Sequence, residues 1–147
     1  MRTDAKPIFL DTNILLAATD TSRSAHTDCH ALLESGFKGT CSLFTNAQVF
    51  REYLVVATRP HEVNGLGMDP IQALENIASF QQCIQILEET VQVSNRLLKL
   101  VATHKLTGKR IHDANIVATM LENGITRLVT LNPSDFSCFD TLSVEAP

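Results

Sequence analysis

Short apolar runs of strand length alternate along this chain with longer stretches of helical periodicity. Four runs predict strands at residues 8–10, 39–44, 84–87 and 126–131, and a weaker run at 142–144 predicts an edge strand. Between these runs, amphipathic stretches predict helices over residues 13–18, 24–35, 47–58, 70–82, 91–104 and 112–123. The alternation of strands and helices indicates an α/β fold with a largely parallel sheet.

Capping and breaking residues mark the ends of these elements. Gly36 stands where a glycine commonly ends a helix, and Thr45 and Asn46 are suitable caps for the helix that follows them. Pro60 stops that helix, and residues 61–69 are predicted to form a loop. The residues predicted to face inward from the helices over 24–35 and 91–104 are Cys29, Leu32, Leu33, Leu97, Leu98 and Val101.

The composition is ordinary for a globular protein. The 147 residues predict a single domain, residues 1–147, which is long enough to bury a core. The formal net charge of −4 gives no overall attraction to nucleic acid, so contact with RNA needs a local basic patch. The four cysteines are widely spaced, and the polar start of the chain does not resemble a signal peptide. With no apolar run of about 18 residues that would span a membrane, we expect a cytoplasmic protein with reduced thiols.

The stretch from Ile8 to Asn13 organises the candidate chemistry. An apolar strand ends in Asp11, and a helix follows at once. In open parallel sheets, ligands bind in the crevice beyond the C-terminal ends of the strands. Asp11 is therefore a candidate metal ligand. Asp is also a favoured N-cap residue, and this residue alone leaves both roles open.

Two later acids fall at comparable places. Asp113 opens a predicted helix in line with the apolar stripe that includes Ile116 and Met120. Asp135 follows the strand predicted over 126–131. Each has a simpler explanation, because a helix N-terminus favours a carboxylate and Asp commonly forms turns. The case for a shared site therefore depends on the set of acids.

Glu52 is the most informative acid because it lies in the middle of a helix, where a capping role does not apply. Thr45 and Val49 precede it on its face, and Val55 and Val56 are expected to continue the apolar stripe after it. Burying a carboxylate without a partner costs several kcal/mol, so Glu52 is expected to be paired or to hold a cation. Arg110 is the alternative partner.

Four acids of this kind predict a site for a hard divalent cation. Carboxylate oxygens suit Mg²⁺ or Mn²⁺ better than Zn²⁺, and packed carboxylates repel one another unless a cation holds them. Such a cation lowers the pKa of a bound water and neutralises charge on a phosphate. The set therefore indicates metal-dependent hydrolysis of a phosphate ester.

Taken in order, the polar segments resemble the PIN-domain ribonucleases, and most closely the VapC-like toxins of toxin–antitoxin pairs. The segments that match are Leu10-Asp11-Thr12-Asn13, Glu52, His112-Asp113-Ala114 and Thr130-x-Asn132-x-x-Asp135-Phe136. The resemblance covers nearly the whole chain. It implies a three-layer α/β/α fold with a central, mostly parallel sheet, and a Mg²⁺- or Mn²⁺-dependent endoribonuclease that leaves 5′-phosphate ends.

The resemblance also implies a role for each acid in an in-line attack by a metal-activated water. Asp11 and Asp113 would be direct ligands, Glu52 would hold the cation or orient the water, and Asp135 would act through water or on a second ion. Asn132 stands where some relatives have Asp, which leaves the fourth acidic position open between Asn132 and Asp135. The small polar residues that match supporting positions are Thr12, Asn13, Thr130 and Asn132.

Contacts with RNA and protein partners are expected at a few further places. Lys109 and Arg110 lead into Asp113, and Arg51 adjoins Glu52, so these three are the candidate phosphate contacts. For Lys105, simple solubility is favoured. The resemblance implies a homodimer and an inhibitory antitoxin. The apolar segments expected to supply those surfaces are residues 14–18, 49–56 and 71–80.

Other chemistries fit the sequence less well. His26, Cys29 and His30 share a helical face, but no fourth zinc ligand lies nearby in the sequence. Phosphoacceptor domains need adjacent acids after the first strand, aspartyl phosphatases need Asp-x-Asp, and no phosphate-binding glycine loop is present. The stronger alternative is a PIN-like module that binds RNA or a protein without significant nuclease activity, which metal-dependent turnover would distinguish.

Overall fold

A computed structural model describes residues 5–147, so the first four residues of the polar N-terminal stretch lie outside the described part. Its centre is a five-stranded sheet in which every pair of neighbouring strands is parallel. The strands are β1 (Ile8–Leu10), β2 (Leu43–Asn46), β3 (Ile84–Leu87), β4 (Arg127–Val129) and β5 (Ser143–Glu145). The predicted parallel sheet is confirmed, and its weak edge strand begins one residue later than expected.

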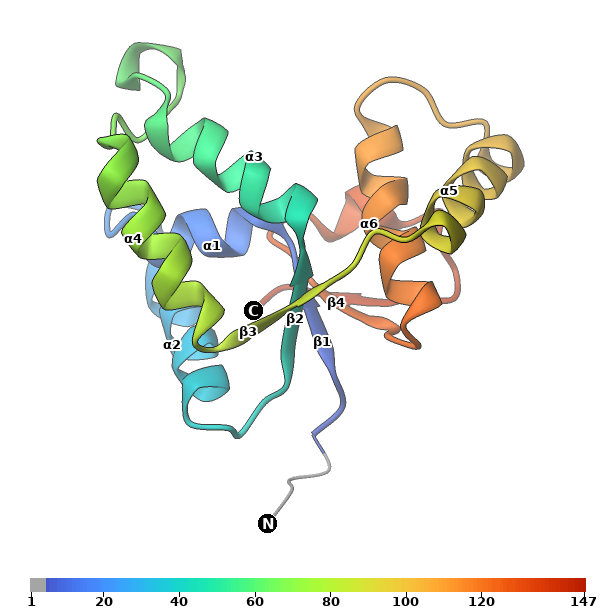
Figure 1. Ribbon diagram of the computed structural model, residues 1–147, viewed down its shortest axis with the longest axis horizontal. Coiled ribbons are helices and arrows are strands. Elements are labelled where there is room, and N and C mark those ends of the chain that lie inside the picture. Colours follow the sequence, from blue (N-terminus) through green and yellow to red (C-terminus); the bar gives the residue numbers. More distant parts are fainter. Residues whose placement is uncertain (1–4) are drawn as a thin grey trace.

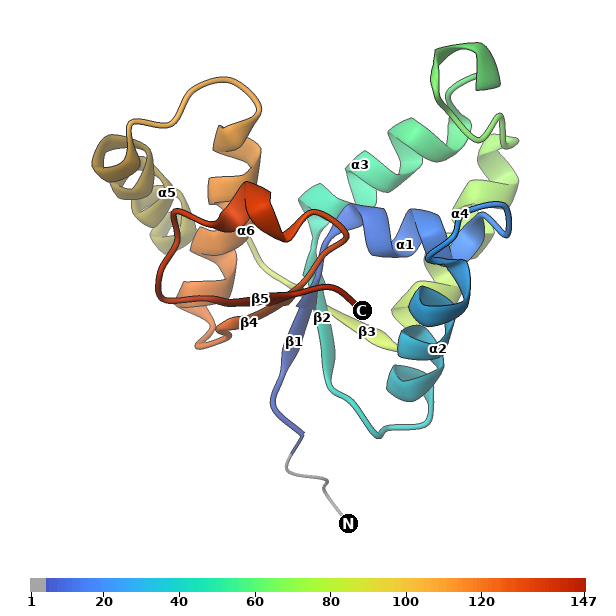
Figure 2. The same cartoon turned by 180° about the vertical axis from the view of Figure 1, so that it is seen from behind.

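Helices cover the sheet on both sides. Figures 1 and 2 show α1 to α4 on one side and α5 and α6 on the other, which gives the three layers that the resemblance implied. The helices are α1 (Thr12–Thr19), α2 (His26–Phe37), α3 (Ala47–Thr58), α4 (Pro70–Gln81), α5 (Val91–His104) and α6 (Arg110–Glu122). Two short 3₁₀ helices, η1 (His61–Val63) and η2 (Pro133–Phe136), lie in the connections. None of the described helices is long and apolar enough to cross a membrane.

The strand order β3-β2-β1-β4-β5 places β1 at the centre of the sheet. The chain runs from β1 to β2 and β3 at one edge and then returns to β4 on the other side of β1, so the order reverses between β1 and β4. The Asp11 N–H donates to the Val129 carbonyl across this point, at 3.1 Å. A reversal of this kind opens a crevice beyond the strand C-termini, where ligands of open α/β sheets bind.

The first strand is buried on both faces, as its apolar run predicted. Ile8, Phe9 and Leu10 are at most 2% exposed. Phe9 is paired with Phe44 of β2 on one side and with Leu128 of β4 on the other. A central strand without freedom to shift gives Asp11, the next residue, a fixed position.

The end of α2 differs from the prediction. Gly36 lies inside the helix, and the glycine with a left-handed backbone is Gly39, at φ +76°. A side chain at position 36 would meet Leu43 Cδ1 at 2.4 Å and the Cys83 carbonyl at 3.0 Å. Gly36 is therefore required for close packing and not for capping.

The second strand begins at Leu43, not at Gly39. The N–H groups of Thr40 and Cys41 turn back to the Ser35 carbonyl, so these residues belong to the turn after α2. Of the two predicted caps, Asn46 is the N-cap of α3, accepting from the Val49 N–H at 3.0 Å. Thr45 is a strand residue.

The buried face of α5 is rotated from the predicted one. Leu98 is 67% exposed, whereas Val93 is 1% exposed and Leu97 and Leu100 pack against the core. The spacing 93, 97, 100 follows the helical period, and position 98 falls outside it. Leu98 was therefore wrongly predicted to face inward.

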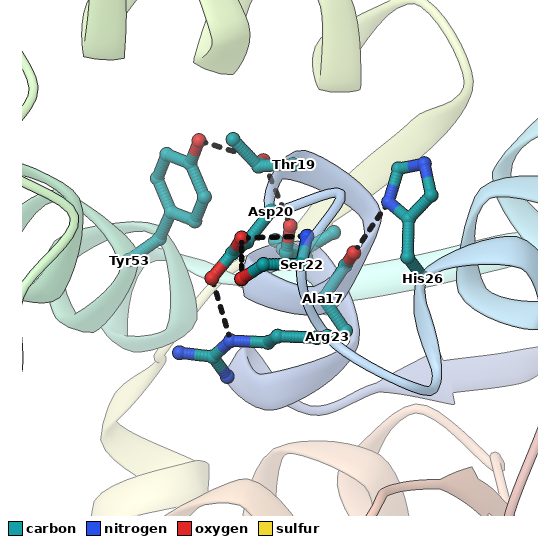
Figure 3. Close-up of polar contacts among 8 residues, drawn as sticks. Ala17, Thr19, Asp20, Ser22, Arg23, His26 and Tyr53 are labelled. Carbon is teal, nitrogen blue, oxygen red and sulfur yellow. Dashed lines mark hydrogen bonds and ion pairs between the residues drawn. The ribbon is translucent and has the colours of Figure 1, made fainter.

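The turn between α1 and α2 is held by its own polar groups (Figure 3). Asp20 accepts from the Ser22 N–H and hydroxyl at 3.0 and 2.6 Å and from Arg23 Nε at 3.3 Å. Hydrogen bonds from Ser22 are the main cause that lowers the Asp20 pKa. His26 Nδ1 lies 2.8 Å from the Ala17 carbonyl. His26 therefore has a structural role in this turn.

Candidate active site

Asp11 occupies the tip of β1 and both of its oxygens accept hydrogen bonds. Oδ1 accepts from the Thr12 N–H at 2.7 Å, and Oδ2 accepts from the Thr130 hydroxyl at 2.9 Å. The first contact makes Asp11 the N-cap of α1, so the simpler role does apply. Each carboxylate oxygen has two acceptor positions, and capping therefore leaves Asp11 able to bind another group.

A second layer of hydrogen bonds holds this arrangement. The Asn13 amide donates to Thr130 Oγ1 at 3.1 Å and accepts from the Leu131 N–H at 3.0 Å. The Asn132 N–H also donates to Thr130 Oγ1, at 3.2 Å. The loop after β4 is thereby joined to the first turn of α1. The structure thus places Asn13 and Thr130 around Asp11, as a supporting role requires.

Glu52 is brought to the same edge of the sheet by α3, and neutral donors hold both of its oxygens. The Thr12 hydroxyl donates to Oε2 at 2.8 Å, and the Gln48 amide donates to Oε1 at 2.9 Å. Arg110, the alternative partner, instead donates to Cys138 Sγ at 3.4 Å. Glu52 is therefore oriented by hydrogen bonds and not neutralised by the arginine that the sequence suggested.

Asp113 stands in the first turn of α6, and its pKa is raised to about 6. Loss of hydration on burial is the largest cause, and the negative charges of Asp11, Asp135 and Glu52 raise the pKa further. The Arg110 charge acts in the opposite direction. Asp113 therefore lies within electrostatic reach of all three other acids.

Asp11 shows the same mutual effect. Burial raises its pKa, hydrogen bonds from Thr130 and Thr12 oppose the rise, and the charges of Glu52 and Asp135 add to it. The charges of neighbouring acids thus disfavour the ionisation of both Asp11 and Asp113, so the four acids found in the sequence lie within electrostatic reach of one another at this edge of the sheet.

The two candidates for the fourth acidic position, Asp135 and Asn132, have different surroundings in the structure. The charge of Asp135, carried by η2, raises the pKa of both Asp11 and Asp113. Asn132 and Asp135 are both exposed, and Asn132 contacts Thr130 through its backbone N–H. Asp135 therefore acts on the other acids by its charge, whereas Asn132 belongs through its backbone to the loop beside Asp11.

A cleft of about 550 Å³ adjoins these acids. Its lining consists of Thr12, Arg51, Glu52, Val55, Val56, Lys109, His112 and Asp113. Val55 was expected to continue a buried stripe below Glu52, yet it is 56% exposed because this face of α3 forms the cleft wall. Two of the acids, Glu52 and Asp113, therefore open onto a surface groove with a partly apolar wall.

Two of the three predicted phosphate contacts lie in this groove. Arg51 and Lys109 line it from α3 and from the residue before α6. Arg110 points instead toward Cys138, beyond η2. Lys105 ends α5 in a left-handed conformation, at φ +52°, and is not part of the cleft lining. The groove thus combines a carboxylate cluster with a basic border.

The donor set suits a hard divalent cation. The four acids offer only oxygen ligands, and burial together with charge repulsion raises the pKa of Asp11 and Asp113; a bound cation would relieve the repulsion. Within residues 5–147, no three His, Cys, Asp or Glu side chains stand close enough together to enclose an ion. The fit therefore concerns donor type and charge. In the described part of the chain, His26, Cys29 and His30 do not form a zinc cluster either.

One residue that the sequence prediction missed is Gln48. It lies one helical turn before Glu52 and is only 2% exposed. The signal that could have found it is the i, i+4 spacing, which places the two side chains on one face of the helix.

Residues 8–139 match the family model of the PIN domain. Because the match covers most of the chain, the protein belongs to the PIN domain family, and the resemblance indicated by the sequence is confirmed. The comparison with curated proteins gave no match.

Solved structures share this fold across almost their whole length. VapC20 of Mycobacterium tuberculosis, a sarcin–ricin loop cleaving toxin, superimposes with a TM-score of 0.68 at 15% identity, covering 89% of this chain and 94% of that chain. VapBC-1 from nontypeable Haemophilus influenzae gives 0.68 at 18% identity, covering 95% and 97%. VapBC2 from Rickettsia felis, bound to a promoter DNA fragment, gives 0.67 at 17% identity, covering 95% and 98%. At these identities the likeness shows the fold.

Proposed function

We propose that this protein is a divalent-metal-dependent endoribonuclease that hydrolyses RNA phosphodiesters with water, and that it is the toxin of a toxin–antitoxin pair. The observation that carries the proposal is the electrostatic coupling of Asp113 to Asp11, Glu52 and Asp135 at the C-terminal edge of the sheet. Membership of the PIN domain family supports the same activity.

The metal in this proposal is Mg²⁺ or Mn²⁺. Asp11 and Asp113 would hold it directly, Glu52 would hold it or orient the attacking water, and Asp135 would act through water or on a second ion. When bound, the cation supplies a water of lowered pKa and charge neutralisation at the phosphate. Above pH 6 Asp113 is mostly ionised, which is the form required of a ligand.

The remaining residues keep the acids in place. Thr12 and Gln48 fix both oxygens of Glu52, and Asn13 and Thr130 fix the loop that contacts Asp11. Effective positioning of reacting groups is itself a large part of catalysis. Arg51 and Lys109 would contact the phosphates of an RNA strand lying in the groove.

The proposed partners are an inhibitory antitoxin and a second copy of this chain. Three of the solved structures with this fold are described as VapBC or toxin–antitoxin complexes. Of the apolar segments expected to form partner surfaces, residues 14–18 are at most 8% exposed and belong to the core. Helix α4 remains the better candidate, because Ile71 and Leu74 are 65% and 51% exposed.

Light scattering tests the dimer. We expect a dimer mass for the wild type and a shift toward monomer for Ile71→Lys. Leu98→Lys is the matched control, because Leu98 is equally exposed but lies on α5. A monomer mass for the wild type at micromolar concentration would contradict the homodimer.

The activity itself is tested by incubating the wild type with a mixture of structured RNAs in Mg²⁺, Mn²⁺ or EDTA. We expect cleavage that requires a metal and leaves 5′-phosphate ends. Cyclic phosphate ends that persist in EDTA would indicate attack by the RNA's own 2′-hydroxyl and would overturn the metal-water mechanism. Metal-dependent RNA binding without products would favour the binding-module alternative.

A further inference from the structure

Gln48 connects the two helices that carry Glu52 and Asp113. Its amide nitrogen donates to Glu52 Oε1 at 2.9 Å and to the His112 carbonyl at 3.0 Å. Its amide oxygen accepts from Asn115 Nδ2 at 2.6 Å. The side chain is therefore bonded at both amide hydrogens and at its oxygen, and His112 is the residue just before Asp113.

These partners determine which way the amide points. A carboxylate and a backbone carbonyl can only accept, so the nitrogen of Gln48 must face Glu52 and His112. The oxygen then faces Asn115, whose amide also donates to Glu89. A continuous chain of hydrogen bonds thus runs from Glu52 through Gln48 and Asn115 to Glu89, and every member of it has a defined direction.

We propose that Gln48 is a positioning residue that sets the Glu52 carboxylate relative to Asp113 for cation binding; this inference rests on the proposed metal-dependent function. Gln48 is 2% exposed and does not line the cleft, so it would act through Glu52 and not on RNA. Groups that orient metal-binding side chains typically change metal affinity or activity by about 10–100-fold when they are removed.

A purely structural role predicts a different result. A buried hydrogen bond between α3 and α6 would contribute to stability, and its loss would leave the surviving acids able to bind metal. Thr119 provides the comparison, because it is fully buried on α6 and bonds to Asn46, the N-cap of α3, at 3.2 Å without contacting an acid. Thr119→Val therefore removes a buried link between the same two elements.

The experiment compares wild type, Gln48→Met and Thr119→Val by calorimetric titration with Mn²⁺, after circular dichroism has shown that each variant is folded. Methionine keeps the length of glutamine but removes its donors and acceptor. We expect Mn²⁺ affinity to fall about 10–100-fold in Gln48→Met and to stay unchanged in Thr119→Val. In RNA cleavage, kcat should fall in Gln48→Met while KM stays unchanged.

The outcomes separate this inference from the proposed function. Wild-type affinity for Mn²⁺ in a folded Gln48→Met protein overturns the positioning role and leaves the nuclease proposal standing. A wild type that neither binds Mn²⁺ nor cleaves RNA overturns both. If Gln48→Met does not fold, Gln48→Ala carries the test, because it also removes the donor to Glu52: weaker Mn²⁺ binding supports the role, and wild-type binding contradicts it.

Discussion

The Thr12 hydroxyl donates a 2.8 Å hydrogen bond to Glu52 Oε2 and thereby links the helix after β1 to the helix after β2. Thr12 is also the residue next to Asp11, and its N–H donates to the Asp11 carboxylate at 2.7 Å. One residue therefore holds two of the acids at once, through its backbone and through its side chain. Thr12 therefore sets the relative position of Asp11 and Glu52 together with Thr130 and Gln48.

Replacing the Thr12 hydroxyl tests that link. Thr12→Val keeps the shape of the side chain but removes the hydroxyl donor. We expect the cleavage rate to fall about 10–100-fold, because one oxygen of Glu52 then lacks the hydrogen bond that orients it. Thr12→Ser keeps the hydroxyl and should retain most of the activity. Single-turnover cleavage rates measure both. Equal losses in the two variants would assign the effect to packing and not to the hydrogen bond.

The raised pKa of Asp113 predicts an unusual pH dependence of stability in the metal-free protein. The pKa of Asp113 is about 6 in the folded protein, against the ordinary value of 3.8 that applies to the unfolded chain. Between these two pH values the folded protein therefore binds more protons than the unfolded one. Stability therefore decreases as pH rises from about 4 to about 6. Asp113→Asn removes this penalty and should stabilise the metal-free protein at pH 7 by on the order of 2 kcal/mol.

Urea unfolding at pH 4.5 and pH 7 measures the effect. Asp28→Asn is the control, because Asp28 is an exposed acid on α2. A stability difference between wild type and Asp113→Asn that does not grow with pH would contradict the raised pKa. Saturating Mn²⁺ should stabilise the wild type by mass action and should stabilise the Asn variant much less.

The basic border of the groove should give RNA binding its salt dependence. Arg51→Ala and Lys109→Ala each remove one expected phosphate contact, which should lower the slope of log affinity against log salt by about 1. Lys99→Ala is the control, because Lys99 is exposed on α5 and does not line the cleft. Fluorescence anisotropy with a catalytically inactive protein measures the slopes. Identical slopes in all three variants would place the RNA elsewhere.

Tyr53 is a structural residue on the same helix as Glu52 and should behave differently from it. Its fully buried hydroxyl lies 2.9 Å from the Thr19 hydroxyl (Figure 3). It also accepts from Asn76 at 3.0 Å, so Tyr53 joins α3 to α1 and α4. Tyr53→Phe leaves these partners short of a hydrogen bond, which typically costs about 1–3 kcal/mol. Denaturant unfolding should show this loss, with kcat unchanged. A lower kcat at unchanged stability would contradict the assignment.

The sequence indicated the site because its acids fall at places defined by local pattern. Asp11 follows a wholly apolar strand, Glu52 interrupts an apolar face, and Asp113 heads a stripe whose members Ile116 and Met120 are buried. Strand tips and helix faces are set by periodicity, so these acids could be predicted to converge.

The features that the sequence did not reveal depend on contacts between distant elements. Gly36 is required by Leu43 and Cys83, and the exposure of Val55 follows from the groove that α3 shares with the start of α6. The contacts of Gln48 with His112 and Asn115 belong to the same class. The local sequence around these residues does not indicate which distant residues they contact, so their roles are visible only in the folded structure.

The most direct test of the account compares RNA cleavage by wild type, Asp113→Asn and Asp28→Asn in Mn²⁺, with the same RNA mixture and equal amounts of folded protein. The account predicts products from the wild type and from Asp28→Asn, and none above background from Asp113→Asn, because only Asp113 lies within reach of the other acids. Cleavage by Asp113→Asn at the wild-type rate would contradict the claim that these acids form the catalytic centre.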